Sequence, residues 1–290
     1  MGKILVTGAC GQLGTELRLL TEGKRNFIFT DAVDAEGIVK LDILDKDALE
    51  RFCKENSVEA IINCAAYTNV DGAESDQVRC AAINVDGVRN LSHAALGCDA
   101  ALIHVSTDYV FDGQRKRGAY REDNPCRPQS VYGKTKRQGE LAFRRSGARG
   151  VIIRTAWLYS PFGKNFVKTM LRLGSTKEQI GVVADQYGTP TYAKDLAAAI
   201  LKILPEAREF KGEIFHYTDE GACTWFDFAA AIMTYAGLGC KVNPLSTAEY
   251  PTAAARPAYS LLDKSKIRDT FNVETPWWSV SLKDCLERLG

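Results

Sequence analysis

The stretch that decides the fold is Lys3-Ile4-Leu5-Val6-Thr7-Gly8-Ala9-Cys10-Gly11-Gln12-Leu13-Gly14, near the start of the chain. A short apolar run, typical of a buried strand, passes directly into glycines spaced Gly-x-x-Gly-x-x-Gly and then into a helical pattern. Gly8 allows a tight turn, Gly11 lets backbone N–H groups approach a pyrophosphate, and Gly14 lets the helix pack close to the strand. Because a helix N-terminus carries partial positive charge, this turn predicts a dinucleotide-binding site.

The pattern of a strand followed by a helix repeats through the first half of the chain. Further apolar runs rich in Val and Ile occupy Asn26–Thr30, Ile38–Leu41, Ala60–Asn63, Ala100–Ser106 and Gly150–Thr155. Between the runs lie the helical patterns Gln12–Thr21, Lys46–Glu55, Ala82–Gly97 and Val131–Ser146. This alternation predicts an α/β protein with a Rossmann-type doubly wound parallel sheet. Ligands of such sheets bind at the carboxyl ends of the strands.

The second half is less regular and predicts a smaller mixed α/β substrate domain. Ala193–Leu204 and Thr224–Ala236 have the pattern of amphipathic helices, the second capped by Thr224. We expect an NAD(P)-binding Rossmann domain over residues 1–155, with a return segment at about 182–218. The substrate-binding domain is expected at about 156–181 and 219–290.

Composition excludes several classes of protein. The 37 Lys and Arg residues against 36 Asp and Glu residues leave a net charge of +1, so we expect no nucleic-acid or anionic-lipid partner. No apolar run is long enough to predict a membrane span. The nine cysteines form no Cys-x-x-Cys pair and lie away from the three histidines, so no metal site is expected. Scattered cysteines of this kind favour a reducing, cytoplasmic location.

Several residues at the ends of the predicted strands suit a dinucleotide. Asp31 ends the second strand, where a carboxylate accepts hydrogen bonds from ribose hydroxyls and repels a 2′-phosphate. That position favours NADH over NADPH. Asp42 and Ile43 follow the third strand, at the expected place of the adenine, and Cys64-Ala65-Ala66 follows the fourth with small side chains.

The most specific chemistry lies in Tyr132-Gly133-Lys134-Thr135-Lys136. Tyr132 and Lys136 stand one helical turn apart, so both point from one face of the helix. A neighbouring ammonium favours the phenolate and therefore lowers the pKa of a tyrosine. Thr107 ends the fifth strand, and its hydroxyl can hydrogen-bond a substrate carbonyl. These three residues are the predicted catalytic group.

Together these motifs resemble the extended short-chain dehydrogenase/reductase superfamily. Within it, the chain is most similar to the dTDP-4-dehydrorhamnose reductase family, and the likeness runs nearly end to end. The stretches that carry the closer likeness are Ala66-Tyr67-Thr68-Asn69-Val70-Asp71, Ser106-Thr107-Asp108-Tyr109-Val110-Phe111, Arg154-Thr155-Ala156-Trp157, Asn165-Phe166-Val167-Lys168-Thr169-Met170, Asp185-Gln186-Tyr187-Gly188-Thr189-Pro190-Thr191 and Arg256-Pro257.

The resemblance implies reduction of a 4-keto sugar attached to dTDP, with NADPH or NADH as the cofactor. Tyr132 would give a proton to the carbonyl oxygen, Lys136 would hold the nicotinamide ribose, and Thr107 would hydrogen-bond the same oxygen. The cofactor-binding residues expected on this basis are Gly8, Cys10, Gly11, Gln12, Leu13, Gly14, Asp31, Asp42, Ile43, Cys64, Ala65, Ala66, Tyr67, Tyr132 and Lys136. The expected substrate-binding residues are Thr68, Val70, Thr107, Asp108, Tyr109, Tyr132, Trp157 and Arg256. For Arg256, a contact with the nucleotide diphosphate and an interdomain ion pair are both open.

Three alternatives remain at the level of sequence. Sugar-nucleotide 4,6-dehydratases follow the catalytic Thr with Asp-Glu, whereas Thr107 is followed by Asp108-Tyr109, which disfavours dehydration. A non-catalytic NADP-binding protein, similar to the regulatory subunit of methionine adenosyltransferase, would keep much the same motifs. A reductase of another nucleotide 4-keto sugar is the third alternative. A homodimer is compatible with each of them.

Overall fold

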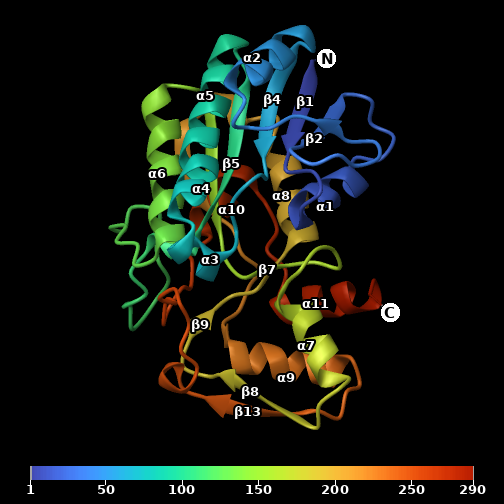
Figure 1. The fold of residues 1–290 in the computed structure, drawn as a ribbon, viewed down its shortest axis with the longest axis vertical. Helices are drawn as coiled ribbons and strands as arrows, with labels where there is room; N and C mark the ends of the chain where they lie inside the picture. Colours follow the sequence, from blue (N-terminus) through green and yellow to red (C-terminus); the bar gives the residue numbers. More distant parts are fainter. Residues whose placement is uncertain (1, 290) are drawn as a thin grey trace.

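A computed structural model describes residues 2–289 of the chain and contains a seven-stranded parallel sheet (Figure 1). The strand order is β11-β6-β5-β4-β1-β2-β3. The strands are β1 (Lys3–Thr7), β2 (Phe27–Asp31), β3 (Val39–Lys40), β4 (Val58–Asn63), β5 (Ala101–Thr107), β6 (Gly150–Thr155) and β11 (Lys211–His216). The order reverses direction beside β1, so the carboxyl ends of β1, β4 and β5 lie at the switch point where such sheets bind ligands. The predicted fold class is confirmed.

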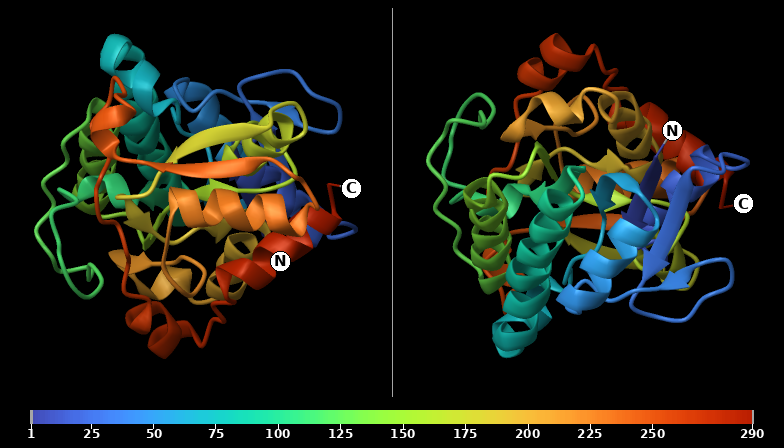
Figure 2. Two further views of the ribbon diagram at one scale, coloured as in Figure 1. Left: turned by 90° about the horizontal axis from the view of Figure 1, so that it is seen from below. Right: turned by 90° about the horizontal axis from the view of Figure 1, so that it is seen from above.

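Helices cover both faces of this sheet (Figures 1 and 2). One face packs on α1 (Gln12–Leu20), α8 (Ala193–Ile203) and α10 (Ser265–Phe271), with Leu17 and Ile200 fully buried. The other face packs on α2 (Lys46–Glu55), α5 (Gly87–Gly97) and α6 (Val131–Ser146), with Leu49 and Phe143 fully buried. Apolar side chains on both faces explain why the strands read as continuous hydrophobic runs.

A second, smaller apolar core lies below the ligand edge of the sheet (Figure 1). Its elements are β7 (Leu158–Tyr159), α7 (Phe166–Gly174), β8 (Gln179–Val183), β9 (Tyr187–Gly188), β10 (Thr191–Tyr192), β12 (Cys223–Thr224), α9 (Trp225–Tyr235), β13 (Lys241–Leu245) and α11 (Trp278–Glu287). The Thr224 side chain caps α9 in a capping box with Asp227, as predicted for Thr224. Tyr159, Phe228 and Leu282 are fully buried in this core.

Two features of the first half differ from the predictions. The expected helix at 82–97 is the end of a longer run, since α3 (Val70–Ser75) and α4 (Gln77–Ala81) precede a π-helical turn at Ala82–Asp86. The seventh strand, β11, lies in a segment for which no strand was predicted. Short 3₁₀ turns occupy Asp108–Val110, Ala207–Glu209 and Thr247–Glu249.

The last helix is attached to the first. Arg288 Nη1 and Nη2 donate to the two carboxylate oxygens of Glu16 at 2.8 and 3.1 Å, and the Glu16 side chain is 1% exposed. The Arg288 guanidinium also contacts the hydroxyl of Tyr192. This pairing joins α11 to α1 across nearly the whole length of the chain. Within residues 2–289, no helix combines the length and the apolar character needed to cross a bilayer.

Candidate active site

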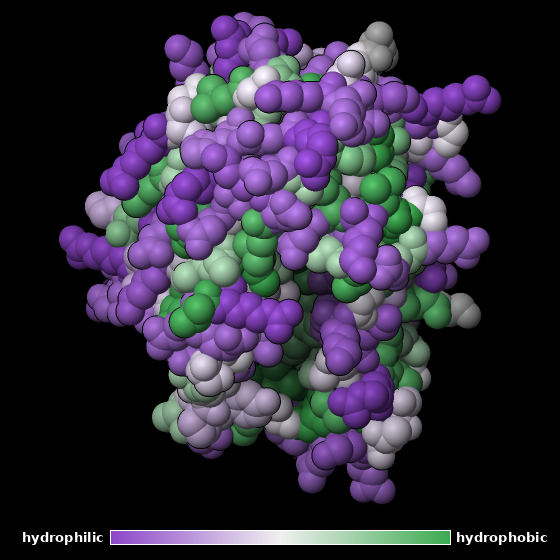
Figure 3. Space-filling model, turned by 45° about the horizontal axis from the view of Figure 1, so that its top comes forward, coloured by the Kyte–Doolittle hydropathy of each residue, from purple (hydrophilic) through white to green (hydrophobic). Residues whose placement is uncertain are grey.

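A cavity of about 870 Å³ lies at the carboxyl edge of the sheet, between the sheet and the smaller core. The space-filling view shows the surface deeply hollowed (Figure 3). The cavity is lined from the glycine turn after β1 to Trp225 at the start of α9. Its size and position suit a dinucleotide lying along the sheet edge, with a second ligand at the smaller core.

The glycine turn is shaped to receive a phosphate. Gly8 has φ +68°, and a Cβ there would lie 2.6 Å from the amide nitrogen of Ala65. A Cβ on Gly14 would lie 2.4 Å from the carbonyl oxygen of Gly8. Gly11 begins α1 without a side-chain cap, so the first N–H groups of α1 are left for an anion. The turn therefore fits the pyrophosphate of NAD(P).

Asp31 stands beside this turn and lines the cavity. Its Oδ2 accepts a hydrogen bond from the Cys10 amide at 3.0 Å, which holds the carboxylate at the end of β2. Cys10 itself does not line the cavity, and its role there is to orient Asp31 through the backbone. Asp42 and Ile43 line the same end of the cavity, with Ile43 buried.

The segment after β4 forms the opposite wall. Cys64, Ala65 and Ala66 line the cavity, whereas Tyr67 does not. The Tyr67 backbone is held by Asn84, whose Oδ1 accepts from the Tyr67 amide at 2.9 Å and whose Nδ2 donates to its carbonyl at 3.2 Å. Tyr67 thus shapes the wall through its backbone.

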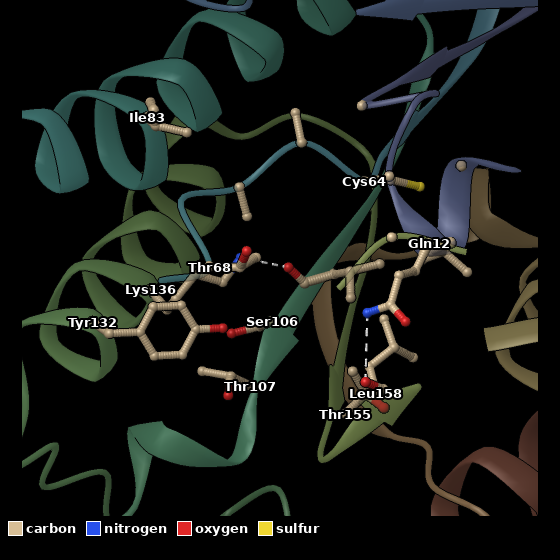
Figure 4. A pocket seen from close by; sticks show the side chains of 18 of the residues that line it. Gln12, Cys64, Thr68, Ile83, Ser106, Thr107, Tyr132, Lys136, Thr155 and Leu158 are labelled. Atoms are coloured by element: carbon tan, nitrogen blue, oxygen red, sulfur yellow. Dashed lines mark hydrogen bonds between the residues drawn. The ribbon is translucent and has the colours of Figure 1, made fainter. Parts of the chain in front are cut away.

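Thr107, Tyr132 and Lys136 meet at the cavity (Figure 4). The phenol of Tyr132 points from α6 toward the end of β5, where Ser106 and Thr107 lie (Figure 4). The Ser130 hydroxyl caps the start of α6 by accepting from the Gly133 amide at 3.1 Å, which fixes the first turn that carries Tyr132.

The phenol of Tyr132 stays protonated in this setting. Burial raises its pKa above the usual value, and a hydrogen bond from the Thr107 hydroxyl offsets only part of that rise. The expected lowering by Lys136 is not found, because burial dominates and the ammonium is bound elsewhere. A protonated phenol is the form that can give a proton to a carbonyl oxygen.

Lys136 is 2% exposed, and its Nζ donates to the carbonyl oxygen of Val105 at 2.7 Å. Burial lowers its pKa to about 8, against the attraction of the nearby Glu140 carboxylate. An ammonium has three N–H donors, so two remain for a ribose after the bond to Val105.

The residues that follow Thr107 shape the substrate side. The Thr107 hydroxyl donates to Asp108 Oδ1 at 3.0 Å, while Asp108 Oδ2 is buried and has no partner among the described residues. Burial raises the pKa of Asp108 to about 6. The Tyr109 ring meets the Tyr132 ring edge to face, with centroids 5.5 Å apart. Thr68 and Val70 line the cavity nearby.

Trp157 forms an aromatic wall with a residue that sequence reasoning missed. Its indole stacks on that of Trp225, with centroids 3.5 Å apart and planes at 11°. The Trp157 backbone has φ +48°, a strained value for a residue with a Cβ, and the indole leaves no room for a Cβ on Gly188. Both indoles line the cavity.

Arg256 lines the cavity and makes the interdomain ion pair that was one of its two expected roles. Its Nη2 lies 2.5 Å from Asp71 Oδ2, and its Nη1 donates to the Tyr109 hydroxyl at 3.0 Å. Asp71 also accepts from the Ala254 amide at 3.1 Å, so the loop that carries Arg256 is held against α3.

The structure therefore brings the expected residues to one cavity, apart from Cys10 and Tyr67, which lie behind its wall. Lining residues that the sequence reasoning missed are Ala32, Leu41, Leu44, Arg79, Ile83, Val105, Ser106, Thr155, Ala156, Leu158, Gly163, Lys164, Asn165 and Trp225. Asn165 joins the glycine turn from the distant segment before α7, since its Nδ2 donates to Gln12 Oε1 at 2.9 Å. Its place within a family-like stretch was the one available signal.

A doubly wound parallel sheet with a glycine turn after β1, and with Thr107, Tyr132 and Lys136 at one cavity, defines a nicotinamide-dependent oxidoreductase of the short-chain dehydrogenase/reductase type. The sequence also matches the model of the RmlD substrate binding domain family over residues 2–290. The chain belongs to this family.

Individual relatives agree with this assignment. The chain is 41% identical to a dTDP-4-dehydrorhamnose reductase of Aggregatibacter actinomycetemcomitans, over 98% of each chain. A crystal structure of a dTDP-4-dehydrorhamnose reductase from Clostridium acetobutylicum is 42% identical, with a TM-score of 0.92 and 99% of each chain covered. The enzyme of that name from Bacillus anthracis, in complex with NADP, is 35% identical, with a TM-score of 0.89 and complete coverage of both chains.

Proposed function

We infer that the protein reduces the 4-keto group of dTDP-4-dehydro-L-rhamnose to give dTDP-L-rhamnose, with NADPH or NADH as reductant. The observation that carries this inference is the meeting of Thr107, Tyr132 and Lys136 in a cavity that also contains the phosphate-binding turn. The names of full-length relatives at up to 41% identity support the substrate. The NADP complex of the relative from Bacillus anthracis supports the cofactor.

Each of the three residues has one task in this reaction. The bound nicotinamide supplies a hydride to the carbonyl carbon. Tyr132, kept protonated by burial, gives its proton to the carbonyl oxygen. Thr107 turns its hydroxyl to the same oxygen and stabilises the charge that develops there. Lys136 holds the nicotinamide ribose through its two remaining N–H donors.

The substrate contacts belong to the same proposal. The Trp157 indole provides an apolar wall for the sugar. Arg256 is oriented by Asp71 and Tyr109, so its planar guanidinium can meet the substrate diphosphate. Thr68, Val70, Asp108 and Tyr109 complete the substrate side of the cavity.

We further propose a division into two domains. A Rossmann domain of residues 1–155 with a return segment at about 182–218 is supported by the apolar cores on the two faces of the sheet. A substrate domain of about 156–181 and 219–290 is supported by the separate smaller core. Ile267 and Phe271 of α10 pack in the core beneath the sheet, so α10 would join the first domain.

A cytoplasmic location and a homodimer are the remaining proposals. All nine cysteines are free thiols in the structure, as a reducing compartment requires. Trp277 and Val280, each 62% exposed near the start of α11, offer apolar surface to a second copy.

Turnover of the substrate tests the proposed function. The purified protein is mixed with dTDP-4-dehydro-L-rhamnose and either NADPH or NADH, and the loss of nicotinamide absorbance is followed. We expect oxidation with at least one cofactor, and none in the Tyr132→Phe variant. Tight cofactor binding without oxidation would instead favour the regulatory, non-catalytic alternative. Faster turnover of a different nucleotide 4-keto sugar would favour the third.

A further inference from the structure

A buried group of charges lies directly behind the catalytic residues. Its centre is Glu140 on α6, whose carboxylate is completely buried, as is the side chain of Arg154 on β6. Arg154 donates through Nε to Glu140 Oε1 and through Nη2 to Oε2, both at 2.8 Å. Arg137, one turn earlier on α6, donates to Oε2 at 2.6 Å. A carboxylate removed from water needs this many donors to remain charged.

Glu140 also contacts the strand that carries Thr107. The Ser106 hydroxyl donates to Glu140 Oε1 at 2.6 Å, and Ser106 pairs with Arg154 in the register of β5 and β6. One carboxylate therefore joins α6, β5 and β6 at the edge of the cavity. Since Ser106 immediately precedes Thr107, this contact limits how far the end of β5 can move relative to the helix that carries Tyr132 and Lys136.

The charge of Glu140 bears on Lys136. The two residues stand one turn apart on α6, and so lie on one face of the helix. The groups that face Lys136 are Tyr132 and Glu140 on α6, Cys80 on α4, Cys64 after β4, and His104 and the Val105 carbonyl on β5. Among these groups Glu140 is the one carboxylate, and burial keeps His104 and the two thiols uncharged.

Glu140 itself is ionised. Although burial opposes its charge, hydrogen bonds from Arg154, Ser106 and Arg137 hold the pKa of Glu140 below its usual value. A permanent negative charge so close to a buried ammonium stabilises the ammonium against loss of its proton.

We propose that Glu140 is a positioning residue of the active site, which keeps the buried Lys136 charged and fixes the end of β5 against α6. The proposal rests on the proposed reductase function for the role of Lys136 in holding the cofactor. It assigns to Glu140 an effect on the pH range over which the cofactor binds, in addition to an effect on stability.

The test is the pH dependence of cofactor binding without substrate. Dissociation constants of NADPH are measured by quenching of tryptophan fluorescence from neutral to alkaline pH. For the unmodified chain we expect affinity to fall as pH rises through about 8, where Lys136 loses its proton. In Glu140→Gln this fall should begin about one pH unit lower, because the attraction of the carboxylate is lost. Glu140→Asp, which keeps the charge, should restore most of the range.

Arg137→Gln is the matched control. It removes one partner of Glu140 from the same helix but leaves the carboxylate, so it should not move the fall in affinity to lower pH. The profile of kcat/KM against pH should shift with the binding profile in Glu140→Gln. If Glu140→Gln does not fold because Arg154 is left unpaired, the double variant Glu140→Gln/Arg154→Gln removes both charges and should show the same downward shift.

Two results would overturn the proposal: an unmoved profile in every folded variant that lacks the Glu140 charge, or an equal downward shift in Arg137→Gln. Failure of the proposed function looks different, because the unmodified chain would then bind NADPH without turning over the sugar, or would not bind it at all.

Discussion

At the scale of single residues, the site uses burial to set protonation states for reduction. Tyr132 is a phenol whose pKa is raised by burial, and Lys136 is an ammonium whose pKa is lowered to about 8 by burial. Near neutral pH both groups therefore carry their protons. The sequence predicted which residue types would meet, from their spacing and their place at strand and helix ends. It did not predict the direction of the Tyr132 shift, because burial depends on the assembled walls of the cavity.

Tyr132→Phe is expected to lower kcat by more than about a hundredfold, because the proton donor is lost while the ring is kept. The cofactor dissociation constant should change little, as measured by fluorescence titration. Near-normal turnover in this variant would remove Tyr132 from its assigned role.

The rate should also depend on pH through Lys136. Its charged form is complete well below pH 8 and is lost as pH rises through about 8, so kcat/KM should fall on the alkaline side. A Lys136→Met variant should bind the cofactor weakly at all pH values and should lose this alkaline fall. A fall that persists unchanged in Lys136→Met would assign the titration to another group.

Asp31→Ala tests the ribose contact. Removing the carboxylate removes its repulsion of a 2′-phosphate, so any preference for NADH over NADPH should narrow, by about tenfold for a loss of about 1.4 kcal/mol of discrimination. The ratio of kcat/KM for the two cofactors measures this. An unchanged ratio would show that Asp31 does not reach the ribose.

At the scale of elements, the regular strands and helices of the first half were predictable because each has a clear period and ends at small or polar residues. α2 and α6 have the predicted bounds, and β1 and β6 do as well. The strand β11 was missed because Lys211 and Glu213 flank a Gly212 of positive φ, and the register with β6 shifts there. The π-helical turn before α5 leaves no mark in the hydrophobic period.

Gly14→Ala is a prediction about the contact between α1 and β1. The new Cβ would lie 2.4 Å from the Gly8 carbonyl and 2.6 Å from the Ala9 Cα, so backbone must move in the phosphate-binding turn. We expect weaker cofactor binding by at least about tenfold and a loss of about 1–3 kcal/mol in the free energy of unfolding. Gly239→Ala is the control, since nothing lies within 4 Å of its Cβ position. Equal behaviour of the two variants in cofactor titration would contradict this account of the turn.

At the scale of the whole molecule, the contacts that complete the site come from segments far apart in the chain. Arg256 meets Asp71, Asn165 meets Gln12, and Trp225 meets Trp157. Such pairs depend on how the smaller core packs against the sheet edge, and local periodicity holds no information about that packing. The near-zero net charge likewise gave no sign of the nucleotides, because the positive potential is confined to the start of α1 and a few side chains.

Arg288→Met tests the closure of the chain on itself. The change leaves the buried Glu16 carboxylate without its guanidinium partner, which is expected to cost about 2–4 kcal/mol in the free energy of unfolding. Chemical denaturation followed by tryptophan fluorescence measures the loss. A double variant with Glu16→Gln should recover part of it, whereas an unchanged stability would show that the pair contributes nothing.

The central claim is that the cavity carries out hydride transfer to C4 of a dTDP-linked 4-keto sugar. The most direct measurement uses a reduced cofactor carrying deuterium at the transferable position, with NMR analysis of the sugar product. We predict deuterium at C4 of dTDP-L-rhamnose in a single configuration, and no labelled product with Tyr132→Phe. Absence of deuterium from C4, with the keto sugar recovered unchanged, would contradict the claim.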